Sequence, residues 1–265
     1  MKSVAAAFQR VWVGSAAVLF FVLGAAAQTT NPLSAAEIQG RELAQKILAQ
    51  RPTEGVTNTG VLEIRRGPER FFRIPIRFET RVAADHWVSL FEALNTNRAA
   101  VDVLRIMHRE DLPNQYAVAR AGRPGLTFPA LDVCRVNAVQ SESELFTPFA
   151  DSDFWLCDLG LEFFHWPEQK IVKKEFARGR GCLVLESTRP HPPPNGYSRV
   201  DCWIDEETLG IVQARAYDAQ GRLLKEFEPK SFKKINGQWE LQDMEIRNAQ
   251  TGSRTRVTFA LTRGG

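Results

Sequence analysis

The sequence predicts a mainly β fold with a few helices (α+β), in which roughly eleven or twelve strands form one antiparallel sheet. Apolar and polar residues alternate along several segments, as they do in strands with one buried face. The links between the last strands are too short for parallel crossovers, so these strands are expected to form an antiparallel meander. So many strands are too many for a flat sheet, and we expect the sheet to curl toward a barrel or to split into two layers.

A helix is predicted ahead of the first strands. Ser34 or Asn31 can cap a helix over residues 35–50, and Pro52 follows just beyond it. The residues available for its core face are Ile38, Leu43, Ile47 and Leu48.

The clearest strand of the N-terminal half covers residues 70–82, which alternate between apolar and charged side chains. Pro75 lies on the polar face and indicates an edge strand or a bulge. Further strands are expected at residues 85–94, 101–109 and 115–120. Residues 122–150 contain three prolines and fit no regular element.

The last hundred residues give the most regular strand pattern. The turn sequences at residues 218–221 and at Asn236-Gly237 predict hairpins. The segment 189–196, RPHPPPNG, predicts an extended loop, either a stiff hairpin connection or a docking site for a partner. The strands are expected at residues 170–178, 182–187, 198–204, 211–217, 223–228, 238–247 and 254–261.

The segment 151–167, DSDFWLCDLGLEFFHWP, contains five aromatic residues and does not alternate as a half-buried strand would. Read as a helix, it places Asp158, Glu162 and His165 on one polar stripe. That stripe is either the solvated edge of the helix or a metal-binding face. The rest of the helix is apolar and must pack either against the protein's own sheet or into a cavity built for an apolar guest. The apolar residues are Phe154, Trp155, Leu159, Leu161, Phe163, Phe164 and Trp166.

The N-terminus predicts export. Lys2 and Arg10 precede an apolar run at residues 11–23, and three alanines at residues 25–27 fit the cleavage rule of signal peptidase. Residues 1–27 are therefore expected to be a cleaved signal peptide that directs the chain to the periplasm. A retained membrane anchor is the alternative, although the run is shorter than the about 20 apolar residues of a membrane span.

The mature chain, residues 28–265, is expected to form a single domain. Without Lys2 and Arg10, 32 of the 34 basic residues remain against 31 acidic ones, so nothing in the charge balance favours nucleic acid. The oligomeric state does not follow from the sequence.

Four cysteines in an exported chain can pair. If Val184 lies opposite Val200 in a hairpin, Cys182 lies opposite Cys202 and a disulfide between them is expected. A shift of two residues places Cys202 opposite Val184 instead, and buried free thiols are the alternative to a bridge.

No motif for catalysis is present, neither a G-x-S-x-G elbow, nor H-E-x-x-H, nor a phosphate-binding glycine loop. The four histidines are scattered singly. The protein is therefore not expected to be an enzyme, and no cofactor or metal site is expected.

The order of several short motifs resembles the outer-membrane lipoprotein-sorting protein family, the LolA-like carriers. The resemblance is good over residues 145–261 and extends to earlier strands only in overall layout. The motifs are Ser152-Asp153-Phe154, His165-Trp166-Pro167, Cys182 to Ser187, Gly196 to Val200, Trp203-Ile204-Asp205, Tyr217-Asp218-x-x-Gly221, Lys225-x-Phe227, Gly237-x-Trp239 and Thr251-Gly252-x-x-Thr255.

The resemblance implies a half-open antiparallel β-barrel of roughly 11 strands, with helices covering the concave side. It implies a non-catalytic periplasmic carrier that binds the acyl chains of lipoproteins or lipids in an apolar cavity. Such a carrier receives its cargo from an inner-membrane donor and hands it to an outer-membrane acceptor. An envelope structural or adaptor protein with the same fold and a filled core is the alternative. The candidate residues for the ligand or lid surface are Phe154, Trp155, Leu159, Leu161, Phe164 and Trp166.

Overall fold

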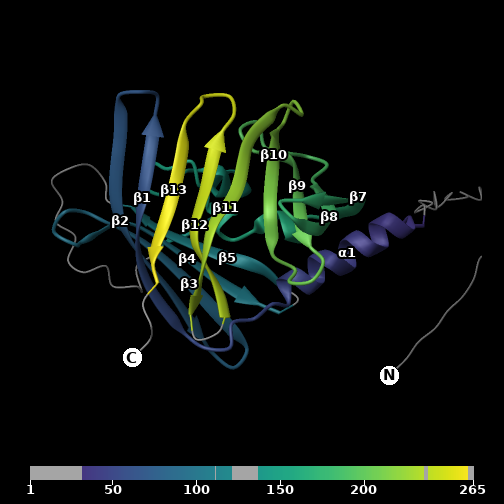
Figure 1. Ribbon diagram of the computed structural model, residues 1–265, viewed down its shortest axis with the longest axis horizontal. Helices are drawn as coiled ribbons and strands as arrows, with labels where there is room; N and C mark the ends of the chain where they lie inside the picture. Colours follow the sequence, from purple (N-terminus) through teal and green to yellow (C-terminus); the bar gives the residue numbers. More distant parts are fainter. Residues whose placement is uncertain (1–31, 111, 121–136, 236–237, 262–265) are drawn as a thin grey trace, which may run out of the picture. The chain divides into compact units, whose positions relative to one another are not determined.

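Thirteen antiparallel strands form one sheet in the computed structural model (Figure 1), which describes residues 32–110, 112–120, 137–235 and 238–261. The strands are β1 (Val56–Arg66), β2 (Arg70–Val82), β3 (His86–Leu94), β4 (Ala100–Arg109), β5 (Leu112–Arg120), β6 (Asn137–Ala138), β7 (Glu168–Ala177), β8 (Arg180–Thr188), β9 (Tyr197–Asp205), β10 (Ile211–Asp218), β11 (Leu223–Ile235), β12 (Gln238–Asn248) and β13 (Arg254–Ala260). The helical segments in this part of the chain are α1 (Ala35–Leu48), η2 (Glu142–Phe146), α2 (Leu156–Leu159) and η3 (Glu162–His165).

The sheet consists of two meanders joined by one long-range pair. Strands β1 to β6 and strands β7 to β13 each follow chain order, and β1 pairs with β13 through contacts such as Ile64 opposite Thr255. The sheet ends at β6 and at β7, which do not pair with each other, so it is not closed. These observations confirm the mainly β fold and the half-open antiparallel barrel, with more strands than expected.

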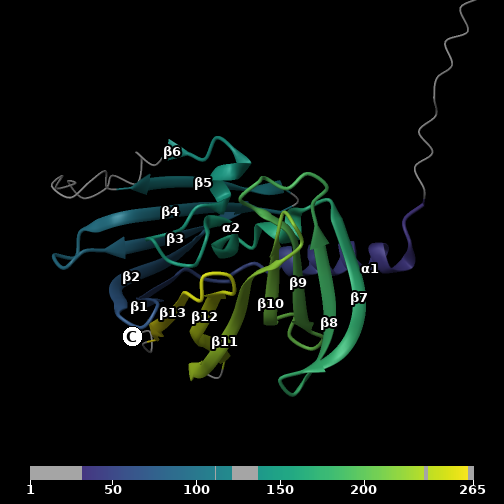
Figure 2. The ribbon, with the colours of Figure 1, turned by 90° about the horizontal axis from the view of Figure 1, so that it is seen from above.

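The sheet curls around a short helical segment. In Figure 2, the arm that contains β2 to β5 and the arm that contains β7 to β10 lie on either side of α2. Apolar residues from both arms, among them Leu104 on β4 and Ile204 on β9, belong to one buried cluster with residues of α2. The concave side of the sheet is therefore the core of the protein.

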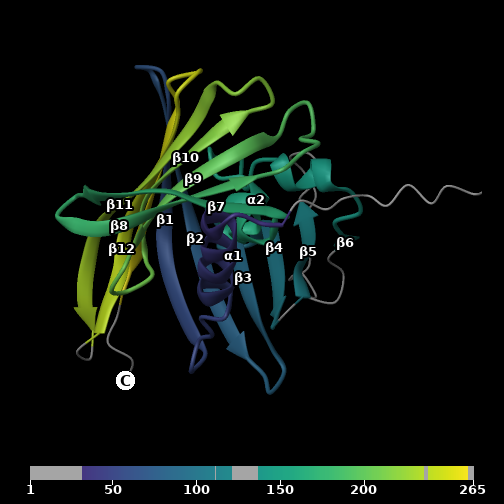
Figure 3. The ribbon, with the colours of Figure 1, turned by 90° about the vertical axis from the view of Figure 1, so that its right-hand side faces the viewer.

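Helix α1 begins as the sequence predicts and ends at Leu48. Ser34 caps it and forms a capping box with Glu37. The helix packs against β7 (Figure 3) through Gly40, where a Cβ atom would lie 2.5 Å from the backbone nitrogen of Lys170. Because contact with β7 sets the buried face, that face holds Gly40, Leu43, Ala44 and Ile47. The prediction is wrong for Ile38, which is 46% exposed.

Strand β2 has the predicted bounds, whereas β1 was not predicted. The β1 sequence, VTNTGVLEIRR, contains Asn58 and Gly60 in its first half, and both residue types are depleted in strands. Pro75 lies inside the sheet, but the β2–β3 register begins at Ile76. The proline therefore sits where β2 has already lost its β3 neighbour, which explains why it is tolerated.

The register of β8 and β9 contradicts the predicted disulfide. Cys182 lies opposite Asp205 and Cys202 lies opposite Leu185, so the two cysteines are on opposite faces of the sheet. Both are buried and free, as is Cys157. The alternative of buried free thiols is correct for these residues, while Cys134 lies outside the described residues. The segment 189–196 connects β8 to β9, and the turn at residues 218–221 connects β10 to β11, as expected.

The aromatic segment is not one continuous helix. The four-residue α2 ends at Leu159 with Gly160 as its C-cap, and Leu161 adopts a left-handed conformation with φ 51° before η3 begins. The single polar stripe of Asp158, Glu162 and His165 is therefore wrong. Backbone and side chains here bond to the sheet instead of continuing a helix, as described below.

The predicted signal peptide, the Asn236-Gly237 turn and part of the segment 122–150 lie outside the described residues. Within the described ranges, no helix has both the length and the apolar character that crossing a membrane requires.

Candidate functional site

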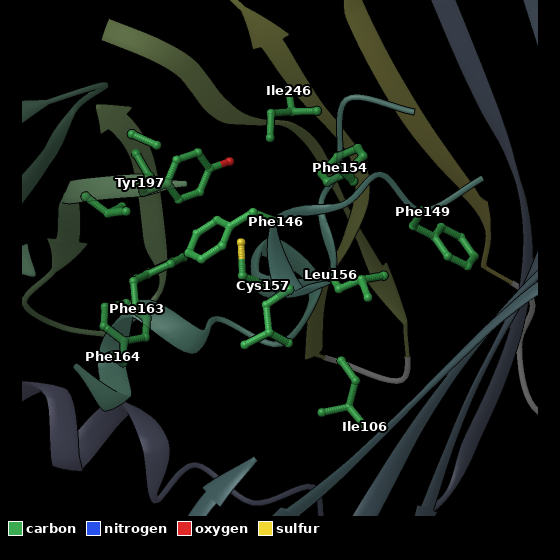
Figure 4. Packing of buried hydrophobic residues seen from close by; sticks show 14 of the residues in the cluster. Ile106, Phe146, Phe149, Phe154, Leu156, Cys157, Phe163, Phe164, Tyr197 and Ile246 are labelled. Carbon is green, nitrogen blue, oxygen red and sulfur yellow. The ribbon is translucent and has the colours of Figure 1, made fainter. Parts of the chain in front are cut away.

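The concave side of the sheet is occupied by residues 142–166, which we call the plug segment. Its aromatic rings pack together with Leu156 and Cys157 between the two arms of the sheet (Figure 4). All of these rings except Trp155 are at least 93% buried. The part of the hollow that the plug segment fills is therefore closed by the protein's own side chains. The buried rings are Phe146, Phe149, Phe154, Phe163, Phe164 and Trp166.

Hydrogen bonds attach the plug segment to the N-terminal arm. The backbone N–H of Ala150 donates to Asp102 Oδ2 on β4 at 2.7 Å. On β5, the Tyr116 hydroxyl donates to Glu162 Oε2 at 2.8 Å. Gly160 lies so close to Tyr116 that a Cβ atom there would overlap the phenol ring. These contacts fix α2 and η3 against β4 and β5.

A buried polar cluster attaches the same segment to the C-terminal arm. Lys225 Nζ on β11 donates to the Asp153 carbonyl at 2.7 Å and lies 3.3 Å from Asp158 Oδ2. The Tyr197 hydroxyl on β9 donates to Asp158 Oδ1 at 2.9 Å. Thr255 on β13 donates to Asp153 Oδ2 at 2.8 Å. The expectation that Asp158 belongs to a solvated edge is wrong, because its carboxylate is bonded on two sides in the interior.

Burial and charge act against each other in this cluster. Burial lowers the pKa of the Lys225 ammonium, and the nearby Asp158 carboxylate opposes that change. Burial also raises the pKa of Tyr197 well above its ordinary value. The sequence marked Lys225 only by the Lys225-x-Phe227 motif of the resemblance and by its position in an alternating strand. Only the fold brings it within reach of residues 67 or more positions away.

A groove of about 1010 Å³ lies beside the plug segment, between α1, η3 and strands β2 to β5. From the plug side it is lined by four of the predicted candidates, Leu159, Leu161, Phe164 and Trp166. Rings of the sheet and the end of α1 complete the apolar part of the wall, and α1 also contributes the polar side chains of Arg41, Glu42, Gln45 and Lys46. These further apolar residues are Phe78, Trp87, Phe91, Ile47 and Leu48.

The other two candidates lie away from the groove. Phe154 is 2% exposed and packs in the core. Trp155 stacks on Tyr197 with ring centres 4.8 Å apart. Both residues hold the plug segment in place, and the sequence could not distinguish this packing from a ligand-facing surface because both need apolar rings.

Ser89, His108, Asn114 and His165 place polar atoms in the groove wall, and we call this part of the wall the polar end. Ser89 on β3 and His108 on β4 lie next to each other, with Ser89 Oγ 3.1 Å from His108 Nε2. His108 Nδ1 lies 2.8 Å from Asn114 Oδ1, and Asn114 Nδ2 donates to the Gly160 carbonyl at 2.8 Å. His165 also lines this groove. Its Nε2 is buried and has no hydrogen-bond partner among the described residues.

Burial favours the uncharged forms of His108, His165 and Glu162 at this end. It lowers the pKa of His108 to about 4 and also lowers the pKa of His165. It raises the pKa of Glu162, behind Asn114, to about 7. An imidazole with so low a pKa is a poor general base near neutral pH, so the Ser89–His108–Asn114 relay is suited to binding rather than to proton transfer. Among the described residues, no three histidine, cysteine or acidic side chains are grouped to hold a metal ion.

The comparisons with known proteins agree with this architecture. A family model described as an uncharacterized protein matches residues 128–263, just over half of the chain. No curated protein matches the chain. A DUF1329 family protein from Desulfovibrio piger has 21% identity and a TM-score of 0.66, with 87% of this chain and 93% of that chain covered.

Two further solved structures have a similar fold. A domain assigned to the outer membrane lipoprotein-sorting proteins, from Vibrio parahaemolyticus, has 20% identity and a TM-score of 0.67, covering 85% of this chain and 92% of its own. A LolA superfamily protein from Nitrosomonas europaea has 13% identity and a TM-score of 0.57, with 86% of this chain and 93% of that chain covered. At these identities the likeness establishes the fold. The chain therefore belongs to the family of the matching model, and its fold is that of the LolA-like proteins.

Proposed function

We propose that the protein is a non-catalytic periplasmic carrier that binds the acyl chains of lipoproteins or lipids and delivers them to the outer membrane. The observation that carries this proposal is the groove of about 1010 Å³, whose wall includes a group of aromatic and aliphatic side chains. An inner-membrane donor and an outer-membrane acceptor are the partners that such a carrier requires.

The groove has the properties that acyl binding needs. Its volume is at the upper end of the about 300–1,000 Å³ typical of small-molecule sites. Acyl chains are bound through the area that they bury, at about 0.8 kcal/mol per methylene, so apolar walls are sufficient. The groove is bounded on one side by α1, whose main contacts are with β7, β8 and η3.

A second candidate function is a structural or adaptor role in the envelope. The tightly packed plug segment favours it, because a core filled by Phe154, Phe163 and Phe164 leaves the central hollow unavailable to a guest. The two functions differ in what they require of the groove: a carrier binds hydrocarbon there, and an adaptor does not.

Binding of a fluorescent palmitoylated peptide, followed by anisotropy, tests the proposal. Leu159→Glu places a charge on the groove wall and should weaken binding at least tenfold, because the carboxylate must lose water when the acyl chain enters. The matched control is Val172→Glu on β7, where the side chain is 41% exposed and outside the groove. Circular dichroism and melting temperature should show that both variants are folded.

The carrier proposal fails if the wild-type protein does not bind the acylated peptide better than the same peptide without its acyl chain. It also fails if Leu159→Glu and Val172→Glu bind equally well. The first result would favour the adaptor role.

A further inference from the structure

The polar end of the groove is built by neighbouring strands. Trp87 lies opposite His108 in the β3–β4 register, and Ser89 lies opposite Ile106. The Trp87 and His108 rings are stacked, with centres 4.9 Å apart, so the indole covers one face of the imidazole. Ser89, His108, Asn114 and His165 therefore bring polar atoms to the groove wall beside the rings of Trp87 and Phe164, while further polar side chains of the wall come from α1.

The hydrogen bonds around His108 have only one consistent direction. The Gly160 carbonyl can only accept, so it fixes the Asn114 amide with its nitrogen toward Gly160 and its oxygen toward His108. His108 Nδ1 must then carry the proton and donate to Asn114 Oδ1. His108 Nε2 is left as an acceptor, and the Ser89 hydroxyl donates to it.

This direction determines what Ser89 can offer to a ligand. Its only proton is committed to His108, whereas the lone pairs of its oxygen can accept. Ser89 is partly exposed and lines the groove. A ligand group that reaches Ser89 therefore forms a hydrogen bond with its oxygen when it can donate a proton, and forms none when it can only accept.

Charge at this end favours a neutral ligand group. His108 and His165 are neutral because burial lowers the pKa of both, and Glu162 is bonded to Tyr116. Arg109 and Glu110 at the end of β4 also line the groove, with charges of opposite sign. An anionic head group that reached Ser89 would meet the lone pairs of its oxygen and not a proton, and burying it would cost its hydration.

We propose that the groove binds a single-chain amphiphile with an uncharged head that donates a hydrogen bond, an acyl amide or a hydroxyl, to Ser89 Oγ at the end formed by Ser89, His108, Asn114 and His165. This inference rests on the proposed function, because it assigns the head group of the ligand whose chain the groove holds. The buried Nε2 of His165, which has no partner among the described residues, provides a second polar atom near the same head.

Probes of equal chain length and different head group test the proposal. Palmitamide and 1-monopalmitoylglycerol donate hydrogen bonds, methyl palmitate only accepts, and hexadecyl phosphate is anionic. Competition with the fluorescent palmitoylated peptide should give the two donors threefold to tenfold tighter binding than methyl palmitate, the range that one net hydrogen bond provides. Hexadecyl phosphate should bind more weakly than the donors.

Ser89→Ala should remove the preference, weakening palmitamide by the same threefold to tenfold and leaving methyl palmitate unchanged. The control is Ser143→Ala, an exposed serine of η2 that does not line the groove. If Ser89→Ala does not fold, the order of the four probes on the wild-type protein is the deciding measurement.

Equal binding of palmitamide and methyl palmitate, or tightest binding of hexadecyl phosphate, would overturn the head-group inference and leave the carrier proposal intact. Failure of every palmitoyl probe to compete would count against the carrier proposal itself. Preference for the donors together with its loss in Ser89→Ala supports the inference.

Discussion

Lys225 Nζ lies 3.5 Å from the centre of the Trp155 ring, and only 2% of the lysine side chain is exposed. The same ammonium donates to the Asp153 carbonyl and approaches Asp158. A desolvated cation over a tryptophan face contributes about 2 kcal/mol. One side chain of β11 thus holds the backbone, a carboxylate and an aromatic ring of the plug segment.

Lys225→Met is expected to reduce the free energy of unfolding by about 3–5 kcal/mol, because it leaves the Asp158 carboxylate buried without its cation. Urea unfolding measures the change. The matched control is Lys230→Met on the same strand, whose surface ion pairs with Glu228 and Glu245 should contribute less than about 1 kcal/mol. Adding Asp158→Asn to Lys225→Met should recover part of the loss, and similar losses in the two single lysine variants would contradict the prediction.

Trp155→Ala should reduce the free energy of unfolding by about 3–5 kcal/mol, as large-to-small changes in a packed core do. The ring stacks on Tyr197 and covers Lys225, so its removal opens a cavity and exposes a charge. Phe176→Ala serves as the control. That ring is 79% exposed, so its loss should change the free energy of unfolding by less than about 0.5 kcal/mol. A melting temperature that barely moves in Trp155→Ala would instead indicate a mobile lid ring.

Gly160→Ala should destabilise the protein by about 1–3 kcal/mol, because the added Cβ would overlap the Tyr116 ring and hydroxyl. Backbone strain does not contribute, since φ at Gly160 is −99°. Gly181→Ala is the matched control, with its nearest atom at an ordinary contact distance of 3.4 Å. Thermal unfolding compares the two, and equal stabilities would show that the Tyr116 contact is looser than described.

Glu162→Gln should change how stability depends on pH. Burial raises the pKa of Glu162 from 4.5 to about 7, partly opposed by hydrogen bonds from Tyr116 and Asn114 and by the charge of Arg189. The folded state therefore holds the proton more tightly, and the stability contributed by this group is complete below pH 4.5 and lost as pH rises through 7. The loss amounts to at most about 3 kcal/mol.

Unfolding free energies of wild type and Glu162→Gln at pH 4.5 to 8 test this. The variant should gain stability relative to wild type as pH rises, whereas Glu207→Gln, at an exposed position, should run parallel to wild type. His108 acts in the opposite direction, since its lowered pKa makes stability fall as pH drops from 6.5 toward 4. That contribution is common to both proteins and cancels in the difference.

Cys157, Cys182 and Cys202 should all be free thiols that are shielded in the folded protein, because each is 0% exposed. A maleimide should label none of the three in the native state. After unfolding without reductant, peptide mapping should find all three labelled, as in a sample that was first reduced. A linked peptide containing Cys182 and Cys202 would contradict the β8–β9 register.

Local patterns in the sequence were sufficient for elements whose cause is local. The capping box of α1 forms between Ser34 and Glu37, three residues apart, and β2 shows its alternation within its own thirteen residues. The turn at residues 218–221 follows from an aspartate and a glycine with positive φ. The resemblance to LolA-like proteins rested on the order of such turns and strands, and the fold agrees with it.

Pairing between distant segments determined the features that local patterns could not, namely the strand register and the shape of the aromatic segment. Strand periodicity gives the faces of β8 and β9 but not their offset, and the actual offset separates Cys182 from Cys202. The aromatic segment looked like one helix because its composition is apolar throughout, yet bonds from Tyr116, Tyr197 and Lys225 break it at Gly160 and Leu161. The sequence thus determined that this chain curls a β-sheet around aromatic residues. Which rings fill the interior and which line the groove was decided by tertiary contacts, because burial depends on partners that lie more than a hundred residues away.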